Sequence, residues 1–206
     1  MAEPTVLTRR HPLENRRASL EALDAELDGT LHLGLEPLGA AVDLRIDPAG
    51  EGPDALGHAL GGALPSAPDS WSELDAGQAL RLGPDEWLLL AGGAAPEELE
   101  ARVDALAAPH GGVTVDVSAQ RVGIRVAGPA ARDLLSFGCS LDLRPSVLGR
   151  GRCAQTLLGQ AAVLLVAHGA QELVLHVRSS FAGAVVDALL DAAVEYRPDP
   201  ARSIPA

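Results

Sequence analysis

Six histidines are the residues of this chain best suited to acid–base chemistry or metal binding: His11, His32, His58, His110, His168 and His176. Metal sites built on one element place histidines as HxH, HxxxH or HExxH, and none of these spacings occurs here. His168 and His176 lie on either side of a predicted hairpin turn, and His176 shares its strand parity with Glu172 and Arg178. We therefore expect both side chains to face solvent and neither to be catalytic.

Serine nucleophiles lack the neighbours that would activate them. Ser118 follows Asp116, and Ser179 follows Arg178, but neither serine stands in a GxSxG turn or beside a histidine. Ser179 or Ser180 is better suited to cap the helix predicted after it.

Cysteine and lysine chemistry is equally restricted. The only two cysteines, Cys139 and Cys153, have a spacing that fits neither a redox CxxC motif nor a zinc knuckle. We expect buried, reduced side chains rather than a disulfide. All 16 basic residues are arginines, so the chain has no lysine for a Schiff base, a P-loop or general base catalysis.

Glycine-rich and acidic segments supply no recognisable cofactor motif. The segment Gly149–Arg152, with the sequence Gly-Arg-Gly-Arg, suits either an anion site or an exposed turn before a strand. Gly61–Gly62 and Gly159 do not extend into a GxGxxG motif or a P-loop. The acidic pairs Asp85–Glu86 and Glu97–Glu98 fit a turn and a helix start. The sequence therefore predicts no catalytic residue, no cofactor-binding residue and no metal ligand.

The length and composition suit a globular protein with a conventional core, built either as one large domain or as two small halves. The 206 residues are 47% hydrophobic but only 2% aromatic, so the core must consist mainly of leucine, valine and alanine. A net charge of −12 argues against nucleic acid as a partner. Neither a signal peptide nor an apolar run of about 18 residues is present, so we expect no membrane span and a cytoplasmic location.

Hydrophobic periodicity predicts the order strand, helix, hairpin, helix in the first half of the chain. Val42, Leu44 and Ile46 alternate with polar residues, as in a strand buried on one face. The expected elements are an extended arm over 1–12, a helix over 14–27, a strand over 41–46, a helix over 54–61, hairpin strands over 79–82 and 87–90, and a helix from Pro96 onward.

The second half repeats this kind of order. We expect strands over 113–117 and 122–126, a helix opening at Gly128–Pro129, and strands over 153–158, 162–167 and 173–177. The last helix should bury Phe181, Val185, Leu189 and Ala192.

These elements predict an α+β fold of two consecutive ferredoxin-like halves. The expected organisation is an N-terminal arm and helix over 1–30, a first α+β half over 31–110, a second α+β half over 111–196, and an irregular, proline-rich tail over 197–206.

Several segments in this order resemble a known family. They are LGPDEWLLL at 82–90, VDVS at 115–118 with GPAARDLL at 128–135, GCSLDL at 138–143, GRCAQTL at 151–157 and RSSFA at 178–182. The chain resembles the gamma subunits of heterotetrameric sarcosine oxidases, and its order of elements is similar to the aminomethyltransferase-like, folate-binding superfamily.

The resemblance implies a non-catalytic gamma subunit. In that family the complex demethylates sarcosine oxidatively to glycine, transfers the one-carbon unit to tetrahydrofolate and forms hydrogen peroxide. The implied partners are alpha, beta and delta subunits. Those subunits would carry the cofactors, namely FAD, FMN, NAD, zinc and tetrahydrofolate, and this chain would carry none.

One departure from the wider superfamily bears on catalysis. Folate aminomethyltransferases place an acidic pair in the strand after the segment that is Thr156–Gly159 here, whereas this chain has Gln160, Ala161 and Ala162. The resemblance therefore implies a retained fold without the transferase site. The alternatives are a stand-alone folate-binding aminomethyltransferase-like protein and a folate-dependent iron–sulfur assembly factor. Gly151–Gln155 is only faintly similar to the cysteine motif of the assembly factors.

Overall fold

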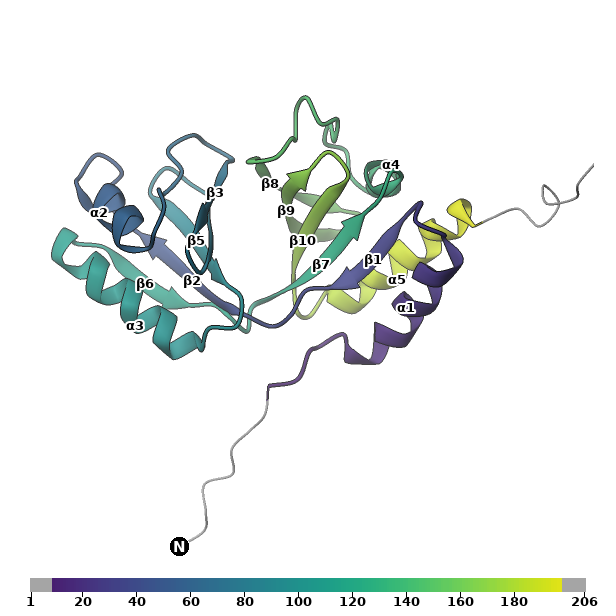
Figure 1. The fold of residues 1–206 in the computed structure, drawn as a ribbon, viewed down its shortest axis with the longest axis horizontal. Helices are drawn as coiled ribbons and strands as arrows, with labels where there is room; N and C mark the ends of the chain where they lie inside the picture. Colours follow the sequence, from purple (N-terminus) through teal and green to yellow (C-terminus); the bar gives the residue numbers. More distant parts are fainter. Residues whose placement is uncertain (1–8, 198–206) are drawn as a thin grey trace, which may run out of the picture.

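A computed structural model describes residues 9–197, which form four layers in the order helices, sheet, sheet, helices (Figure 1). The helices are α1 (Arg17–Glu26), α2 (Gly52–Ala59), α3 (Pro96–Ala107), α4 (Ala131–Ser136) and α5 (Ala182–Ala193), with short 3-10 turns at Glu14–Arg16, Ala108–His110 and Val194–Tyr196. The strands are β1 (His32–Leu35), β2 (Ala40–Arg45), β3 (Trp71–Leu74), β4 (Gly77–Arg81), β5 (Glu86–Ala91), β6 (Val113–Asp116), β7 (Arg121–Ala127), β8 (Cys153–Leu158), β9 (Ala161–Gly169) and β10 (Glu172–Arg178).

The first sheet has the strand order β3-β4-β5-β2-β6, and its pairs are antiparallel. Val42 and Leu44 of β2 and Trp87 and Leu89 of β5 project from one face into a core closed by α2 and α3. The predicted alternation of β2 and the hairpin through Gly83–Asp85 are confirmed.

The second sheet has the strand order β1-β7-β10-β9-β8 and is also antiparallel. Its outer face packs against α1, α4 and α5 in the largest core of the described residues. Leu20 and Leu23 of α1 and Val185 and Leu189 of α5 enter this core at helical spacing.

The inner faces of the two sheets meet in a small apolar cluster that includes Leu80, Leu88, Leu164 and Val166. At one edge the sheets are joined directly, because Ser70 and Arg152 form an isolated antiparallel bridge. The two sheets therefore share an interior, and their inner faces are partly shielded from water.

The strand pairing crosses the predicted boundary between residues 110 and 111. β1 comes early in the chain but pairs with β7 in the second sheet. β6 follows the boundary but pairs with β2 in the first sheet. The fold is thus α+β with two antiparallel sheets, as expected, and the sheets exchange one strand each across the sequence midpoint.

Two details differ from the sequence-based expectations. Neither Ser179 nor Ser180 caps α5, because Phe181 occupies the N-cap position and the hydroxyl of Ser179 donates to the carbonyl oxygen of Ala119 at 2.9 Å. Phe181 is 48% exposed rather than buried. The expected arm lies mostly, and the expected tail almost wholly, outside the described residues.

Candidate functional site

The expectation that His168 and His176 face solvent is wrong. His168 is half-buried, with its ring 4.8 Å from the ring of Trp71. The Nε2 atom of His176 is buried on the inner face of β10. The strand parity of His176 was correct, but the first sheet covers the face that we expected to be solvated.

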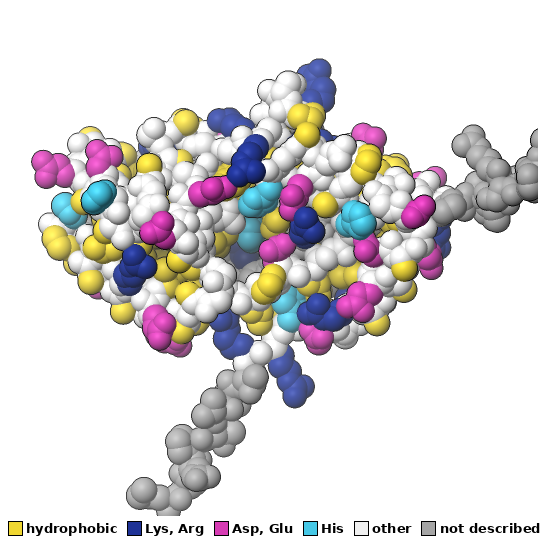
Figure 2. Space-filling model, viewed as in Figure 1, with side chains coloured by type: hydrophobic (Ala, Val, Ile, Leu, Met, Phe, Trp, Pro, Cys, Tyr) yellow, Lys and Arg dark blue, Asp and Glu magenta, His cyan; other side chains and the backbone are white. Residues whose placement is uncertain are grey.

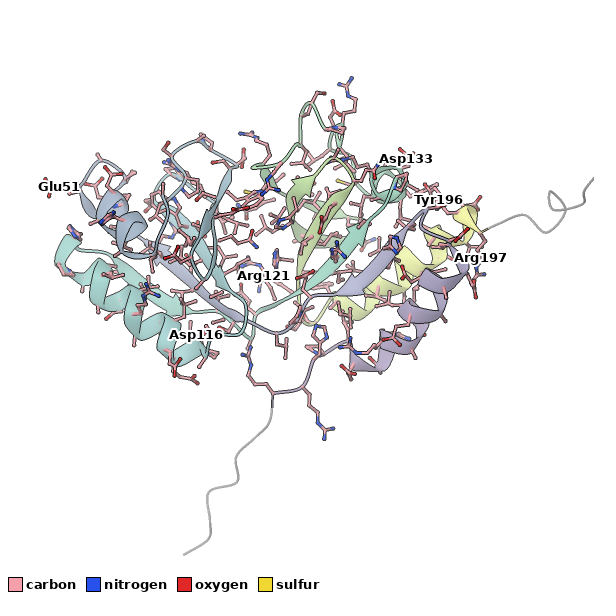
Figure 3. The ribbon with its side chains drawn as sticks, in the orientation of Figure 1. Glu51, Asp116, Arg121, Asp133, Tyr196 and Arg197 are labelled. Carbon is pink, nitrogen blue, oxygen red and sulfur yellow. The ribbon has the colours of Figure 1, made fainter. Side chains whose placement is uncertain are left out.

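Both histidines line a cavity of about 170 Å³ between the two sheets. The second sheet contributes Arg121, Gly123 and His176, and the facing side includes Gln78 of β4. Figure 3 shows Arg121 in the space between the sheets, and Figure 2 shows histidine side chains gathered at the centre of the same view. This cavity brings charged and polar side chains of both sheets together.

Gly123 lines the cavity, and its missing side chain leaves room for the side chain of Glu36 to pack over it. A Cβ atom at Gly123 would lie 2.7 Å from the Cβ of Glu36 and 3.6 Å from Cγ1 of Val174. The backbone fixes Glu36 here, because its amide donates to the carbonyl oxygen of Gly123 at 3.0 Å. On the other side of β7, Gly123 is paired with His176. Glu36 and His176 therefore flank Gly123 on neighbouring strands, and a larger residue at position 123 would displace the side chain of Glu36.

Burial lowers the pKa of the basic side chains that line the cavity. It lowers the pKa of His176 to about 4, with smaller contributions from Arg121 and His168, so His176 is neutral at pH 7. Burial, followed by the like charge of Arg178, also lowers the pKa of Arg121, but a guanidinium keeps its charge at neutral pH. Burial also lowers the pKa of His168. The cavity thus combines the guanidinium of Arg121 with two imidazoles of lowered pKa and the acidic side chain of Glu36.

Several polar atoms at this interface have no partner among the described residues. They include Nε2 of His176, Oε1 of Gln78 and Oδ1 of Asp43, all buried. In the same part of the chain, the guanidinium of Arg121 and the carboxylate of Glu36 form neither a side-chain hydrogen bond nor an ion pair. Buried polar groups of native proteins are usually satisfied, so these atoms point to bound water or a polar ligand.

Ser118 borders the cavity but is held in a structural role. Its hydroxyl lies 2.5 Å from Oδ1 of Asp116 and accepts the amide hydrogen of Ala41 at 2.8 Å. These hydrogen bonds connect the end of β6 to the start of β2. The serine is therefore a bridge between strands rather than a free nucleophile.

The Gly149–Arg152 segment forms an exposed turn whose arginines bind other parts of the protein. Arg150 makes a 2.5 Å ion pair with Glu73, and its guanidinium lies 6.0 Å from the ring centroid of Trp71. Arg152 donates to the carbonyl oxygen of Pro68 at 3.1 Å. Of the two alternatives for this segment, these contacts favour the turn.

Cys139 and Cys153 are free and buried, as predicted. Burial, with the nearby Asp69 as the next cause, raises the pKa of Cys153 to about 12. The thiol of Cys153 is therefore protonated at neutral pH and unsuited to nucleophilic chemistry.

The residues described here contain no group of three or more histidine, cysteine or acidic side chains that could hold a metal ion. Within the same ranges, no helix combines the length and apolar character needed to cross a membrane.

A second feature is an apolar groove on the outside of the second sheet. It has a volume of about 680 Å³ and lies between α4, the β8–β9 turn and α5. Phe137 (65% exposed) and Phe181 (48% exposed) line it, and Asp191 and Glu195 supply acidic groups. Gln160, at the turn where the resemblance predicts a missing acidic pair, also lines this groove.

Comparison with solved structures first shows which proteins share this fold. The aminomethyltransferase of the glycine cleavage system from Bartonella henselae shares the fold, with 17% sequence identity, a TM-score of 0.60, and coverage of 82% of this chain and 48% of that one. A chain of the heterotetrameric sarcosine oxidase from Corynebacterium sp. U-96, solved with pyrrole 2-carboxylate, is much more similar. It is 31% identical with a TM-score of 0.84, and the match covers 93% of this chain and 97% of that one.

Sequence comparison then gives the particular family. Residues 45–195 match the "Sarcosine oxidase, gamma subunit family". The protein named "Sarcosine oxidase subunit gamma" from Corynebacterium sp. (strain U-96) is 34% identical over 192 residues, which is 91% of each chain. The chain belongs to the sarcosine oxidase gamma subunit family.

Proposed function

We propose that the chain is the non-catalytic gamma subunit of a heterotetrameric sarcosine oxidase. The observation that carries the proposal is the match over nearly the whole length of a chain in a heterotetrameric sarcosine oxidase. In this role the protein supports a complex that demethylates sarcosine to glycine, with one-carbon transfer to tetrahydrofolate and peroxide formation. We also propose that this complex acts in the cytoplasm.

The proposed partners are the alpha, beta and delta subunits, which carry FAD, FMN, NAD, zinc and tetrahydrofolate. The chemistry of the described residues supports this division. Ser118 and Cys153 are both held in states unsuited to nucleophilic attack.

The apolar groove beside α5 is the docking surface proposed for a neighbouring subunit. The chain has only two phenylalanines, and both line this groove with much of their surface exposed to water. Burying such surface contributes about 25 cal/mol per Å². Asp191 and Glu195 beside the apolar surface favour a partner segment that carries apolar side chains together with arginine or lysine.

A stand-alone folate-binding aminomethyltransferase is the less favoured alternative. The position that carries an acidic pair in the resemblance has Gln160 at its start, and Gln160 lies at an exposed turn. The enclosed polar cavity is elsewhere, between the sheets.

Co-expression with the neighbouring genes, followed by purification through a tag on this chain, tests the assignment. A yellow, peroxide-forming complex of four different subunits is expected. A tagged chain that purifies alone and binds tetrahydrofolate tightly would contradict it.

The docking surface is tested with the double variant Phe137→Ser and Phe181→Ser in the same co-expression. Because both side chains are exposed, the variant should fold but lose most of the co-purified subunits. Val113→Ser is the matched control, since Val113 is 61% exposed on β6 of the other sheet. Loss of the partners with Val113→Ser alone would place the interface on β6 and overturn the groove assignment.

A further inference from the structure

We propose that the cavity at Gly123 binds a small zwitterionic amino acid of about the size of glycine, with Arg121 holding its carboxylate and Glu36 and Gln78 holding its ammonium group. The inference depends on the cavity alone and does not require the subunit assignment.

Arg121 provides the cationic side of this site. Its guanidinium is half-buried between the sheets and, among the described residues, is not paired with a carboxylate. Guanidinium groups present several donors in a planar fork that matches a carboxylate. Arg178, its cross-strand partner, adds positive potential, whereas the nearby carboxylates of Asp43 and Glu86 act on the pKa of Arg121 in the opposite direction without forming an ion pair with it in the described structure. A ligand carboxylate would satisfy the donors of Arg121.

Glu36 and Gln78 provide the acceptors. Glu36 approaches from the end of β1 and its side chain leans over Gly123, whereas Gln78 faces it from β4 of the other sheet. Oε1 of Gln78 is buried without a partner in the described structure. Acceptors of this kind need a donor, which an ammonium or methylammonium group supplies. An anion alone would leave them unsatisfied.

The separation of these groups agrees with a short ligand. Arg121 and Gly123 project to the same face of β7, two residues apart, which corresponds to about 6.6 Å along a strand. Glu36 lies directly over Gly123. Arg121 and Glu36 therefore border the same short stretch of β7, on a scale that a single small amino acid can span with hydrogen bonds at both ends.

The remaining walls restrict the size and charge of the ligand. Ala41, Leu88, Leu90 and Val174 supply apolar surface, so a long or polar side chain would find no partner there. His176 is neutral and offers one ring nitrogen without a partner. The cavity volume of about 170 Å³ holds a few waters or one small molecule.

Calorimetric titration of the full chain tests the proposal with three probes: glycine, acetate and methylammonium chloride. Glycine should bind saturably, and each of the singly charged probes should bind at least about tenfold more weakly because one set of partners is left unsatisfied. Amide chemical shifts of Gly123 and Glu36 should respond to glycine in the same concentration range.

Three variants locate the site. Arg121→Gln and Glu36→Gln should each weaken glycine binding about tenfold or more, and only Arg121→Gln should weaken acetate binding. Gly123→Ala changes no charge but places a Cβ atom 2.7 Å from the Cβ of Glu36, so the Glu36 side chain must move and glycine binding should weaken as well. Circular dichroism verifies that each variant is folded. His58→Gln, on the exposed surface of α2, is the control and should bind as the parent does.

Each contrary result overturns the proposal in a distinct way. If glycine fails to saturate the folded parent chain, the cavity holds water only. If acetate binds as tightly as glycine and Glu36→Gln has no effect, the site is a simple anion site. If all three cavity variants retain glycine affinity, the ligand binds elsewhere.

Discussion

The indole Nε1 of Trp71 donates a 3.0 Å hydrogen bond to the carbonyl oxygen of Ala167, which joins β3 of the first sheet to β9 of the second. The same indole packs against His168. This single side chain is therefore both a polar and an apolar link between the two sheets.

Replacing Trp71 by phenylalanine should lower the free energy of unfolding by about 1–2 kcal/mol, because the buried carbonyl of Ala167 loses its donor. Urea unfolding measures this loss, and amide exchange should accelerate around Ala167. Trp87→Phe is the matched control, since Trp87 donates to the carbonyl oxygen of Pro65 instead of joining the sheets. Accelerated exchange around Ala167 in the Trp87 variant would contradict the assigned role of Trp71.

The depressed pKa of His176 predicts a loss of stability in mild acid. Burial lowers this pKa from 6.5 to about 4 in the folded protein, so between these pH values the unfolded state binds the extra proton. The contribution of His176 to the free energy of unfolding is fully present above pH 6.5 and decreases as the pH falls toward 4. Arg121 and His168, which face the ring, act in the same direction.

Replacing His176 by phenylalanine should make the unfolding free energy less dependent on pH in this interval. Urea titrations at several pH values between 7 and 4 measure the difference between the variant and the parent. His58→Gln serves as the exposed control and should retain the parent's pH dependence. Parallel curves for the parent and the His176 variant would show that this ring does not control acid stability.

The side chain of Arg132 in α4 forms hydrogen bonds with the backbone at Leu143, at Leu148 and at Gly169–Ala170. Its guanidinium donates to the carbonyl oxygens of Ala170 (2.6 Å), Gly169 (2.7 Å) and Leu148 (2.9 Å), and also to that of Leu143. A lysine cannot reproduce this planar set of donors. Arg132→Lys should therefore lower the free energy of unfolding by about 1–3 kcal/mol.

Chemical denaturation and amide exchange over residues 142–151 measure the effect of the Arg132 variant. Arg102→Lys is the comparison, because Arg102 makes one 2.9 Å bond to the carbonyl oxygen of Ala59 and is exposed. Equal losses in the two variants would mean that the multiple contacts of Arg132 add nothing.

Cys153 should resist alkylation while the protein is folded. Its thiol is buried and burial raises its pKa to about 12, so the reactive thiolate is scarce at pH 8. Iodoacetamide labelling followed by peptide mass spectrometry should show slow modification in buffer and rapid modification in urea. Rapid labelling of the folded chain would contradict the burial of this side chain.

Hydrophobic alternation was sufficient to predict the strands that bury one face on helices, such as β2 and β7. It did not identify β1 and β3, each of which is only four residues long. β6 is equally short, but it was predicted because Val113, Val115 and Val117 alternate with polar residues, whereas β1 and β3 contain no β-branched residue. Their place in the sheets depends on pairing with strands far away in the chain.

The cavity was missed for a different reason. Periodicity separates the two faces of β10 correctly, but it does not show that another sheet covers the polar face. A usable signal was present in the continuous apolar runs of β5 and β9, because strands buried on both faces lose their alternation. Those runs predict a covered inner face, and His176 lies on that face.

The exchange of β1 and β6 between the sheets affects the order in which the two sheets can form during synthesis. On the ribosome β1 emerges early, whereas its partner β7 is synthesised only after every strand of the first sheet, β6 included, has been made. Until then α1 and β1 have no sheet to cover, and their leucines remain available to chaperones. The early sheet, in turn, has an open edge on β2 until β6 is complete. The first sheet can therefore close with β6 before β7 is made, whereas the second sheet closes only after β8, β9 and β10 have followed.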